Sequence, residues 1–321
     1  MDKPLRILIH NDEPDDLVAR LADQVDSAEI AWCDSYDGLA DTLATFRPDV
    51  VYSVRFGNGA YPAAALKGAD GPQWLSVGGS GTDHLGGWDP KVLTVTNSAG
   101  VAADMMAEYT FGAFLHFALD IAGMQADQKK QVWPPRLVTP LAGKNLLIIG
   151  LGQTGQSVAR RAQAFGMNVA GIRARPQPTE AVDRVSGLAD LDAELGQADF
   201  ICVCVPLLDS TRGLLNVDRL QKIKPGAVLV DVSRGGVVDG AGIRDALISG
   251  RLRGAALDVF ETEPLPKEHP LWDTPNLIIS PHCSSVYDGW TLHSIDMFAA
   301  NVKRWQAGEA LHNLVDPARG Y

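Results

Sequence analysis

Short apolar runs, each followed by a stretch with helical periodicity, recur along the chain and restrict its fold more than any other feature. Val, Ile and Leu dominate these runs with little alternation, which is typical of parallel strands covered on both faces. Strands that alternate with helices in this way predict an α/β protein. The expected strands are Leu5–Ile9, Glu29–Trp32, Val50–Val54, Trp74–Val77, Leu93–Thr96, Leu146–Ile149, Asn168–Ile172, Phe200–Val205, Val228–Val232, Ala255–Val259 and Leu277–Ile279.

The strands fall into two groups, and a long helical stretch that begins near Val101 separates them. A chain of 321 residues is longer than a single core usually grows. The last helix, Tyr287 to Gln306, follows the final strand, and we expect it to return to the first domain. The sequence therefore predicts two doubly wound parallel-sheet domains: a flavodoxin-like discontinuous domain over residues 1–98 and 287–321, and a Rossmann domain over residues 99–286.

The sharpest local signal is the segment NLLIIGLGQTGQSVARRAQAFG, in which a strand leads into three glycines and then an Ala-rich helix. Gly150 permits the tight turn, Gly152 lets the backbone approach a pyrophosphate, and Gly155 allows close packing of helix and strand. The free N–H groups at the helix start, where Gln153 and Thr154 stand, would face the phosphates. The alternative is a strand-to-helix turn without a ligand, but strand, spacing and helix together favour dinucleotide binding.

The next strand bears on which nicotinamide coenzyme is used. A carboxylate roughly 20 residues beyond the glycines would bind the ribose 2′-hydroxyl of NAD. This chain reads NVAGIRARP, with Arg173 where that acid is expected and Arg175 nearby. Two guanidinium groups suit a 2′-phosphate. We favour NADP over NAD, the alternative being that both arginines are solvated loop residues.

Three polar residues follow consecutive apolar strands in the second half of the chain: Arg234 in SRGG, Glu263 in FETEP and His282 in SPHCS. In an open α/β sheet, ligands bind outside the carboxyl ends of the strands, so these side chains are expected to converge near a nicotinamide. His can protonate the alkoxide formed when a ketone is reduced, and a carboxylate beside an imidazolium favours its charged form. Arg can hold a substrate carboxylate by a bidentate pair. Taken singly, each residue has a structural alternative as a loop, surface or capping residue.

Together, the runs IIGLGQTG, VLVDVSRGGVVDGAGIRDAL, GAALDVFETEPLP and NLIISPHCSS resemble the successive signatures of the D-isomer-specific 2-hydroxyacid dehydrogenase family. Its members include glyoxylate/hydroxypyruvate reductases, D-lactate dehydrogenases and phosphoglycerate dehydrogenases. The resemblance runs in order from about Gly78 to Asp316. It implies an NAD(P)-dependent oxidoreductase acting on a small 2-oxo or D-2-hydroxy acid, with the coenzyme bound by residues 99–286 and the substrate by the discontinuous domain.

Carried over residue by residue, the resemblance makes Arg234 the substrate-binding arginine, His282 the acid/base and Glu263 its partner. Backbone N–H groups in GGSGTDHL, near Gly79, Ser80 and Gly81, would receive the substrate carboxylate, and Asp258 would contact the nicotinamide amide. The remaining candidate coenzyme contacts are Cys204, Val205, Pro206, Thr211, Val232 and Ser233.

Two positions depart from the family pattern. Cys204 stands where a His is common, and Tyr287 replaces the usual small hydroxyl residue five positions beyond His282. Tyr287 is therefore a candidate for narrowing the substrate pocket. The resemblance also implies a homodimer formed through the helical stretch Val101–Gly123, and the loop that begins at Trp133 is expected over the site or at the subunit interface.

Composition excludes several other functions. The formal net charge of −11 argues against nucleic acid, whose phosphates would be repelled. The apolar stretch Met105–Gly123 is interrupted by Glu108, His116 and Asp120, which does not fit a membrane span. With no signal-peptide pattern at the start, we expect a cytoplasmic protein with reduced cysteines. The four cysteines lack paired CxxC spacing, so no metal site is predicted.

Two other functions remain open at this point. A dinucleotide-sensing binding protein can share the fold, although that reading would require a basic or peptide-binding extension. Oxidation of formate or phosphite on the same scaffold is the other, and Glu263 argues against it because formate dehydrogenases have Gln next to the catalytic His.

Overall fold

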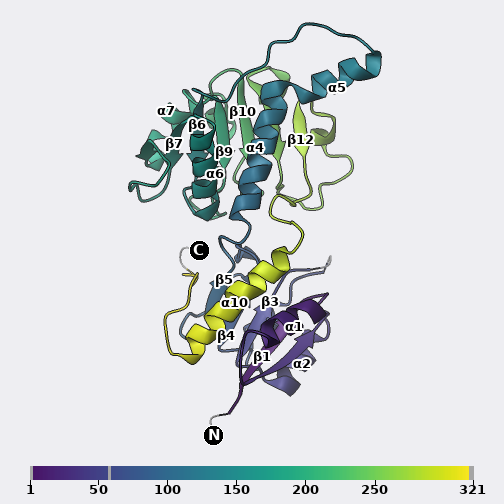
Figure 1. Cartoon of the computed structure of the whole chain (residues 1–321), viewed down its shortest axis with the longest axis vertical. Coiled ribbons are helices and arrows are strands. Elements are labelled where there is room, and N and C mark those ends of the chain that lie inside the picture. Colours follow the sequence, from purple (N-terminus) through teal and green to yellow (C-terminus); the bar gives the residue numbers. More distant parts are fainter. Residues whose placement is uncertain (1–2, 57–58, 318–321) are drawn as a thin grey trace. The chain divides into compact units, whose positions relative to one another are not determined.

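The computed structural model describes residues 3–56 and 59–317, which form two compact units (Figure 1). Unit 1 comprises Met1–Val101 and Tyr287–Tyr321, and unit 2 comprises Ala102–Val286. Each unit contains one parallel sheet with helices on both faces. The fold class expected from the sequence, α/β with two doubly wound parallel sheets, is confirmed.

The sheet of unit 1 has, among the described residues, five strands in the order β2-β1-β3-β4-β5. This is the flavodoxin-like order, in which the sheet grows in both directions from its first strand. Its elements are β1 (Leu5–His10), α1 (Asp15–Ala22), β2 (Ala28–Cys33), α2 (Leu39–Phe46), β3 (Val50–Ser53), α3 (Ala63–Leu66), β4 (Trp74–Val77), η1 (Asp83–Leu85), β5 (Thr94–Asn97) and α10 (Trp290–Gln306).

Helix α10 belongs to unit 1 because its apolar face completes one of the two cores of that unit. Phe298, 1% exposed, lies with its ring 5.3 Å from the rings of both Tyr52 and Trp74 on the sheet. Helix α1 packs beside α10 on the same face, as Figure 1 shows. The helix begins at Trp290, after Gly289 with φ 80°, rather than at Tyr287 as expected.

The sheet of unit 2 has seven strands within the described part of the chain, in the order β12-β11-β10-β9-β6-β7-β8. Counted from β6, this is the Rossmann order 3-2-1-4-5-6 with one further strand. Its elements are α4 (Ala103–Leu119), α5 (Ile121–Lys130), β6 (Asn145–Ile149), α6 (Gln153–Ala164), β7 (Asn168–Ile172), β8 (Arg184–Ser186), η2 (Leu188–Asp190), α7 (Leu191–Leu195), β9 (Phe200–Val203), α8 (Val217–Leu220), β10 (Ala227–Asp231), α9 (Gly240–Ile248), β11 (Leu252–Leu257), η3 (Pro270–Asp273) and β12 (Leu277–Ile279).

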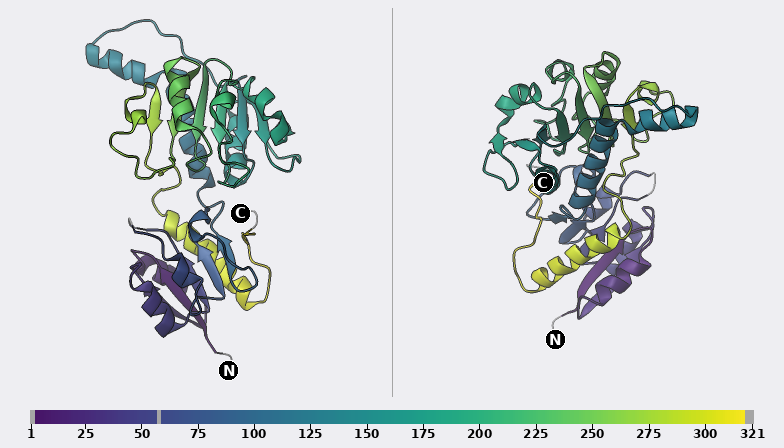
Figure 2. Two further views of the ribbon diagram at one scale, coloured as in Figure 1. Left: turned by 180° about the vertical axis from the view of Figure 1, so that it is seen from behind. Right: turned by 45° about the horizontal axis from the view of Figure 1, so that its top comes forward.

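Alternate residues of the strands in unit 2 pack into two separate hydrophobic cores, one on each face of the sheet. This explains why the strands are unbroken apolar runs in the sequence. Val228 and Val230 of β10 join the core under α4 and α6, whereas Leu229 joins the core under α7, α8 and α9. Figure 1 shows the first of these faces, and the left view of Figure 2 shows the opposite one. Both faces are covered by helices, so the positions in the middle of each strand must be apolar.

Two features of unit 2 were not expected from the sequence. The stretch expected to be one helix breaks at Asp120, whose φ is 53°. The backbone N–H of Asp120 donates to the carbonyl of His116 at the end of α4, and its carboxylate accepts from Gly123 N and so caps α5. The short edge strand β8 has only three residues, too few to show a pattern. No helix of the described residues combines the length and apolarity needed to cross a membrane.

A buried acid ends the interior strand β10. Asp231 is 2% exposed, and its Oδ1 accepts from the N–H and the hydroxyl of Ser233 at 2.9 and 2.5 Å. Burial, opposed by these two hydrogen bonds, raises the pKa of Asp231 to about 7. A carboxyl group with a raised pKa in the folded state binds its proton more tightly there than in the unfolded chain.

We predict that this group makes the wild-type protein lose stability relative to Asp231→Asn as pH rises. The contribution of this proton to stability is complete below pH 3.8, the ordinary pKa of the group, and is lost as pH rises to about 7, its pKa in the folded protein. The difference in unfolding free energy should change by up to about 1.4 kcal/mol per pH unit between these limits and then level off. Urea unfolding of both proteins from pH 4 to pH 8 measures it, and a flat difference would contradict the prediction.

Candidate active site

The glycine-rich turn between β6 and α6 has the shape of a dinucleotide cradle. Gly150 has φ 108°, and a Cβ there would lie 2.8 Å from the carbonyl oxygen of Cys204. A Cβ on Gly155 would overlap the carbonyl oxygen of Gly150, whereas one on Gly152 would meet nothing within 4 Å. The turn therefore requires two of the glycines for its own packing, and Gly152 leaves open backbone in front of the helix.

The N-terminus of α6 faces that open backbone. No side chain caps the helix at Gly152, so the first N–H groups are available to an anion. Gln153 is exposed there, and the hydroxyl of Thr154 lies 3.5 Å from the sulfur of Met106. An open glycine and a helix N-terminus without a side-chain cap fit the pyrophosphate of a dinucleotide.

Arg173 and Arg175 follow β7, the strand next to the glycine turn. Arg173 is half-buried, and its backbone N–H donates to Ser186 at 3.1 Å. Arg175 is exposed. Within residues 3–56 and 59–317, neither guanidinium forms an ion pair. Two unengaged cations therefore stand at the end of β7.

The loop after β9 borders the same turn. The thiol of Cys204 donates to the carbonyl of Gly150 at 3.1 Å, and the neighbouring thiol of Cys202 together with burial raises the pKa of Cys204, which keeps it neutral. Val205 packs against the core under α9. Thr211 donates to the carbonyl of Pro206 at 2.6 Å and accepts from Leu208 N, so its side chain holds this loop in shape.

His282 and Glu263 form a hydrogen-bonded pair at the carboxyl ends of β12 and β11. Nδ1 of His282 lies 2.9 Å from Oε2 of Glu263, and the two side chains are 37% and 33% exposed. Burial would raise the pKa of Glu263, but hydrogen bonds from His282 and from Phe260 N, with the charges of His282 and Arg234, lower it below its usual range. The pair leaves Nε2 of the imidazole as the nitrogen that can exchange a proton with a ligand.

The backbone of His282 has φ 52°, a conformation that is uncommon outside glycine. Asp258, fully buried, holds the segment around it: its Oδ1 accepts from the Ser280 hydroxyl at 2.5 Å and from Cys283 N at 2.9 Å, and its Oδ2 accepts from Ser284 N at 2.9 Å. Three donors from both sides of His282 thus position the imidazole. The contact of Asp258 with a nicotinamide amide stays a prediction, and what the structure shows is that Asp258 anchors this loop.

A further member of this network was not identified from the sequence. The hydroxyl of Tyr109 on α4 lies 2.7 Å from the hydroxyl of Ser280, which in turn donates to Asp258. Ser280 stands in the SPHCS run, but nothing in the sequence connects Tyr109 with it, since the two are 171 positions apart. Hydroxyl and carboxylate together tie α4 to the His282 segment.

Arg234 follows β10 in the loop that leads to α9. The loop begins with Val232 and Ser233. Val232 is buried and its N–H donates to the carbonyl of Val203, and the hydroxyl of Ser233 donates to the carboxylate of Asp231. Arg234 is half-buried, and its Nη1 donates to the carbonyl of Ser233 at 2.8 Å. The strands that carry Arg234, Glu263 and His282 are adjacent and parallel, so these residues lie along one edge of the sheet.

The candidate substrate residues of unit 1 lie at the carboxyl end of β4 and before α10. The carbonyls of Gly79 and Ser80 accept from Ser98 N and Asn97 Nδ2, at 2.9 and 2.7 Å. In the described part of the chain, the N–H groups of Gly79, Ser80 and Gly81 donate no hydrogen bond, so they remain available.

Tyr287, the other candidate in unit 1, directs its hydroxyl within that unit. The hydroxyl donates to the carbonyl of Val101 at 3.1 Å and lies 2.8 Å from Nδ1 of His293. These contacts hold the phenol ring beside the start of α10.

The sequence of this chain matches a family model described as D-isomer specific 2-hydroxyacid dehydrogenase, NAD binding domain, over residues 111–284. Glyoxylate reductase of Korarchaeum cryptofilum is 32% identical over 237 residues, covering 70% of this chain and 69% of that protein. The chain also matches D-3-phosphoglycerate dehydrogenases, of whose length it spans about half.

Solved structures of the same family resemble the whole chain. A D-isomer specific 2-hydroxyacid dehydrogenase of Xanthobacter autotrophicus, solved with NADPH and MES, superposes with a TM-score of 0.86 and 28% identity, covering 99% of this chain and 100% of that one. An NADPH-dependent glyoxylate/hydroxypyruvate reductase of Sinorhizobium meliloti, solved with NADP and sulfate, gives a TM-score of 0.81 and 28% identity, covering 99% and 100%. From the glycine turn, the paired His282 and Glu263, and these matches, the chain belongs to the D-isomer specific 2-hydroxyacid dehydrogenase family.

Proposed function

We propose that this protein is an NAD(P)-dependent oxidoreductase that reduces a small 2-oxo acid to the D-2-hydroxy acid. The observation that carries the proposal is the hydrogen bond of 2.9 Å between His282 and Glu263. These two residues follow β12 and β11, Arg234 follows the adjacent β10, and the glycine turn follows β6 of the same sheet. Relatives named glyoxylate reductase and hydroxypyruvate reductase support glyoxylate and hydroxypyruvate as the first substrates to test.

The residues of unit 2 supply acid catalysis and charge stabilisation in this proposal. When bound, a reduced nicotinamide supplies a hydride to the carbonyl carbon of the substrate. The imidazolium of His282 donates its Nε2 proton to the oxygen that becomes the alkoxide. Glu263 accepts the hydrogen bond of Nδ1–H, which fixes the ring orientation and stabilises the charged ring. The guanidinium of Arg234 binds the substrate carboxylate and polarises the carbonyl.

For unit 1 we propose a substrate-binding role. The N–H groups of Gly79, Ser80 and Gly81 are available to a carboxylate oxygen, in the way that backbone N–H groups commonly bind anions. The aromatic ring of Tyr287, held by Val101 and His293, is the candidate for limiting the size of the substrate side chain.

We further propose that NADP is preferred over NAD. Arg173 and Arg175 stand at the end of β7, where a carboxylate would favour NAD, and two solved relatives contain NADPH or NADP. A 2′-phosphate would pair with these guanidinium groups by charge-assisted hydrogen bonds.

Arg173→Asp should therefore reverse the order of the two coenzymes. The new carboxylate repels the 2′-phosphate and can accept a hydrogen bond from the ribose hydroxyl, so NADPH should bind on the order of tenfold or more weakly than in wild type. Fluorescence titration with NADPH and NADH measures both affinities. Arg160→Asp, an exposed arginine of α6, is the matched control for the change in charge. Equal affinity of the wild-type protein for both coenzymes would refute the preference.

The pH profile of reduction tests the His282–Glu263 pair. His282→Ala should lose on the order of 10²–10⁴ in kcat while coenzyme binding survives. Glu263→Gln keeps the shape but removes the charge that favours the imidazolium. Because reduction needs the protonated ring, the alkaline limb of the kcat/KM profile should move to lower pH. Glu261→Gln, an exposed acid two positions away, is the control and should leave the limb in place. A limb unmoved in Glu263→Gln would assign that residue a structural role only.

We also propose that two copies of the chain associate through the segment that follows α4. Helix α5 has no buried residue, and large apolar side chains stand exposed beyond it, Trp133 at 99% and Leu137 at 101%. In Figure 1 this segment extends away from the sheet of unit 2. Large apolar side chains that are fully exposed mark an association surface. Most soluble oligomers are made of identical chains, so we take a second copy of this chain as the partner that covers them.

The double variant Trp133→Ser with Leu137→Ser should shift the wild-type dimer toward monomers of 34.3 kDa. The loss of two buried apolar anchors weakens association, which sedimentation velocity over a micromolar concentration range would detect. Val92→Ser removes a similarly exposed valine of unit 1 and should have no effect. A wild-type protein that sediments as a monomer throughout that range would refute the proposal.

A further inference from the structure

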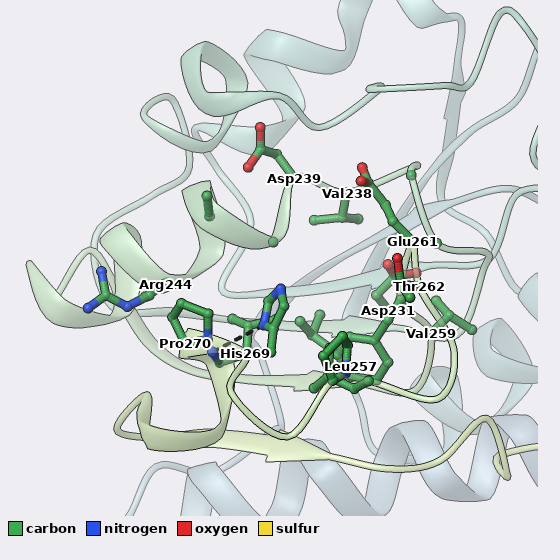
Figure 3. A pocket seen from close by; sticks show the side chains of 18 of the residues that line it. Asp231, Val238, Asp239, Arg244, Leu257, Val259, Glu261, Thr262, His269 and Pro270 are labelled. Carbon is green, nitrogen blue, oxygen red and sulfur yellow. Dashed lines mark hydrogen bonds between the residues drawn. The ribbon is translucent and has the colours of Figure 1, made fainter.

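Unit 2 contains a cavity that none of the candidate coenzyme, substrate or catalytic residues lines. It measures about 640 Å³, within the size range of small-molecule sites. One wall is the loop from Gly235 to Asp239 with the first turns of α9, and the other is the loop from Val259 to Pro266 with the start of η3 (Figure 3). The glycine turn, His282 and Glu263 do not line the cavity, although Phe260, which does, donates its N–H to Glu263 at 2.9 Å.

The cavity combines apolar walls with a buried carboxyl group. Leu257, Leu271, Val238 and Val259 line it, and each is at most 8% exposed. Asp231, 2% exposed, lines it as well. Both hydrogen bonds that the Asp231 carboxylate accepts go to Oδ1, and among the described residues no donor bonds to its Oδ2. The carboxyl group therefore retains an acceptor oxygen without a protein partner.

The charges around the cavity are mostly negative. Its lining has four acids, Asp231, Asp239, Asp245 and Glu261, and one arginine, Arg244. Arg244 pairs with Asp245 at 3.7 Å, and Figure 3 shows its guanidinium turned to the outer edge, away from Asp231. A ligand with a negative charge would be repelled, whereas a cation would be attracted. Arg234 acts on Asp231 through its charge, and the hydrogen bonds to the Asp231 carboxylate come from Ser233.

His269 adds a polar group to the wall. Its Nδ1 accepts from Leu271 N at 3.3 Å, so in the neutral ring the proton is on Nε2, which can donate a hydrogen bond. Figure 3 shows the ring in the middle of the wall formed with Pro270. The wall therefore offers a ligand a hydrogen-bond donor beside the proline ring.

We propose that this cavity is a second ligand site, which binds a small organic ammonium ion whose nitrogen donates to Asp231 and whose hydrocarbon part packs against the leucines and valines. A charge-assisted hydrogen bond to a buried carboxylate is strong, and the apolar walls gain from covering a hydrocarbon. A neutral alcohol of the same shape should bind more weakly because it lacks the positive charge, and a carboxylate should bind more weakly because the charged Asp231 repels it.

The pH dependence of binding follows from the acid at the floor. Burial raises the pKa of Asp231 to about 7, so an ammonium ion that stabilises the charged carboxylate binds better as pH rises through this value. The other charged or titratable groups that act on Asp231 or face the cavity are Asp258 and Arg234 at neighbouring strand ends, and Glu261, Asp239, Asp245, Arg244 and His269 around the cavity.

Calorimetric titration of the full chain with benzylammonium, benzyl alcohol and benzoate tests the site. Benzylammonium should bind about tenfold or more tightly than the other two at pH 8, the ratio expected of one charge-assisted hydrogen bond, and more weakly at pH 5.5. Asp231→Asn keeps the shape and should remove both the preference and its pH dependence. Asp245→Asn, at the exposed rim and paired with Arg244, is the matched control and should bind within about twofold of wild type.

A second variant guards against an effect of Asp231 on folding. Ala241 lines the cavity and is exposed, so Ala241→Trp fills the space without touching the core and should abolish binding although Asp231 remains. Equal affinity for the three probes, or ammonium binding that survives in Asp231→Asn or in Ala241→Trp, would overturn the proposal. None of these measurements depends on catalytic activity, so the outcome is independent of the proposed reductase function.

Discussion

The parallel direction of β6, β9, β10, β11 and β12 is the constraint on which the candidate site of unit 2 depends. Because these strands run side by side in one direction, the residues that follow them meet at one edge of the sheet. Gly150, Cys204, Arg234, Asp258 and His282 come from five stretches of sequence and reach that edge only through this register. The helices on both faces keep the strands dry, so polar chemistry is confined to their ends.

Two buried carboxyl groups, Asp258 and Asp231, lie at neighbouring strand ends and differ in the number of hydrogen-bond donors around them. Asp258 accepts three hydrogen bonds from the segment around His282 and serves as its anchor. The carboxylate of Asp231, one strand away, accepts from Ser233 alone, and burial raises its pKa to about 7. The difference lies in the following chain: after β12 the backbone turns its N–H groups toward Asp258, whereas after β10 it leads off toward α9.

The strands and the glycine turn could be predicted because their causes are local. A run such as Leu146–Ile149 followed by Gly150, Gly152 and Gly155 carries its periodicity and its turn geometry in neighbouring residues. The break at Asp120 was not predicted, because an acid in an apolar helix reads as an interruption of hydrophobicity and not as a cap for a second helix. Strand β8 was missed because three residues paired with β7 carry no pattern of their own.

The sequence by itself determined the α/β class, the order of the motifs and the residue types that chemistry requires, since apolar periodicity and turn residues act over a few positions. The tertiary structure alone decided which distant groups meet. The hydroxyls of Tyr109 and Ser280 touch although 171 positions separate them, and Phe298 packs against Tyr52 although most of the chain lies between them. The cavity behind Asp231 is likewise a product of packing, since its walls come from two loops and a helix whose separation no local pattern encodes. Contacts of this kind depend on strand register and on the volume of all intervening side chains, and these exist only in the folded chain.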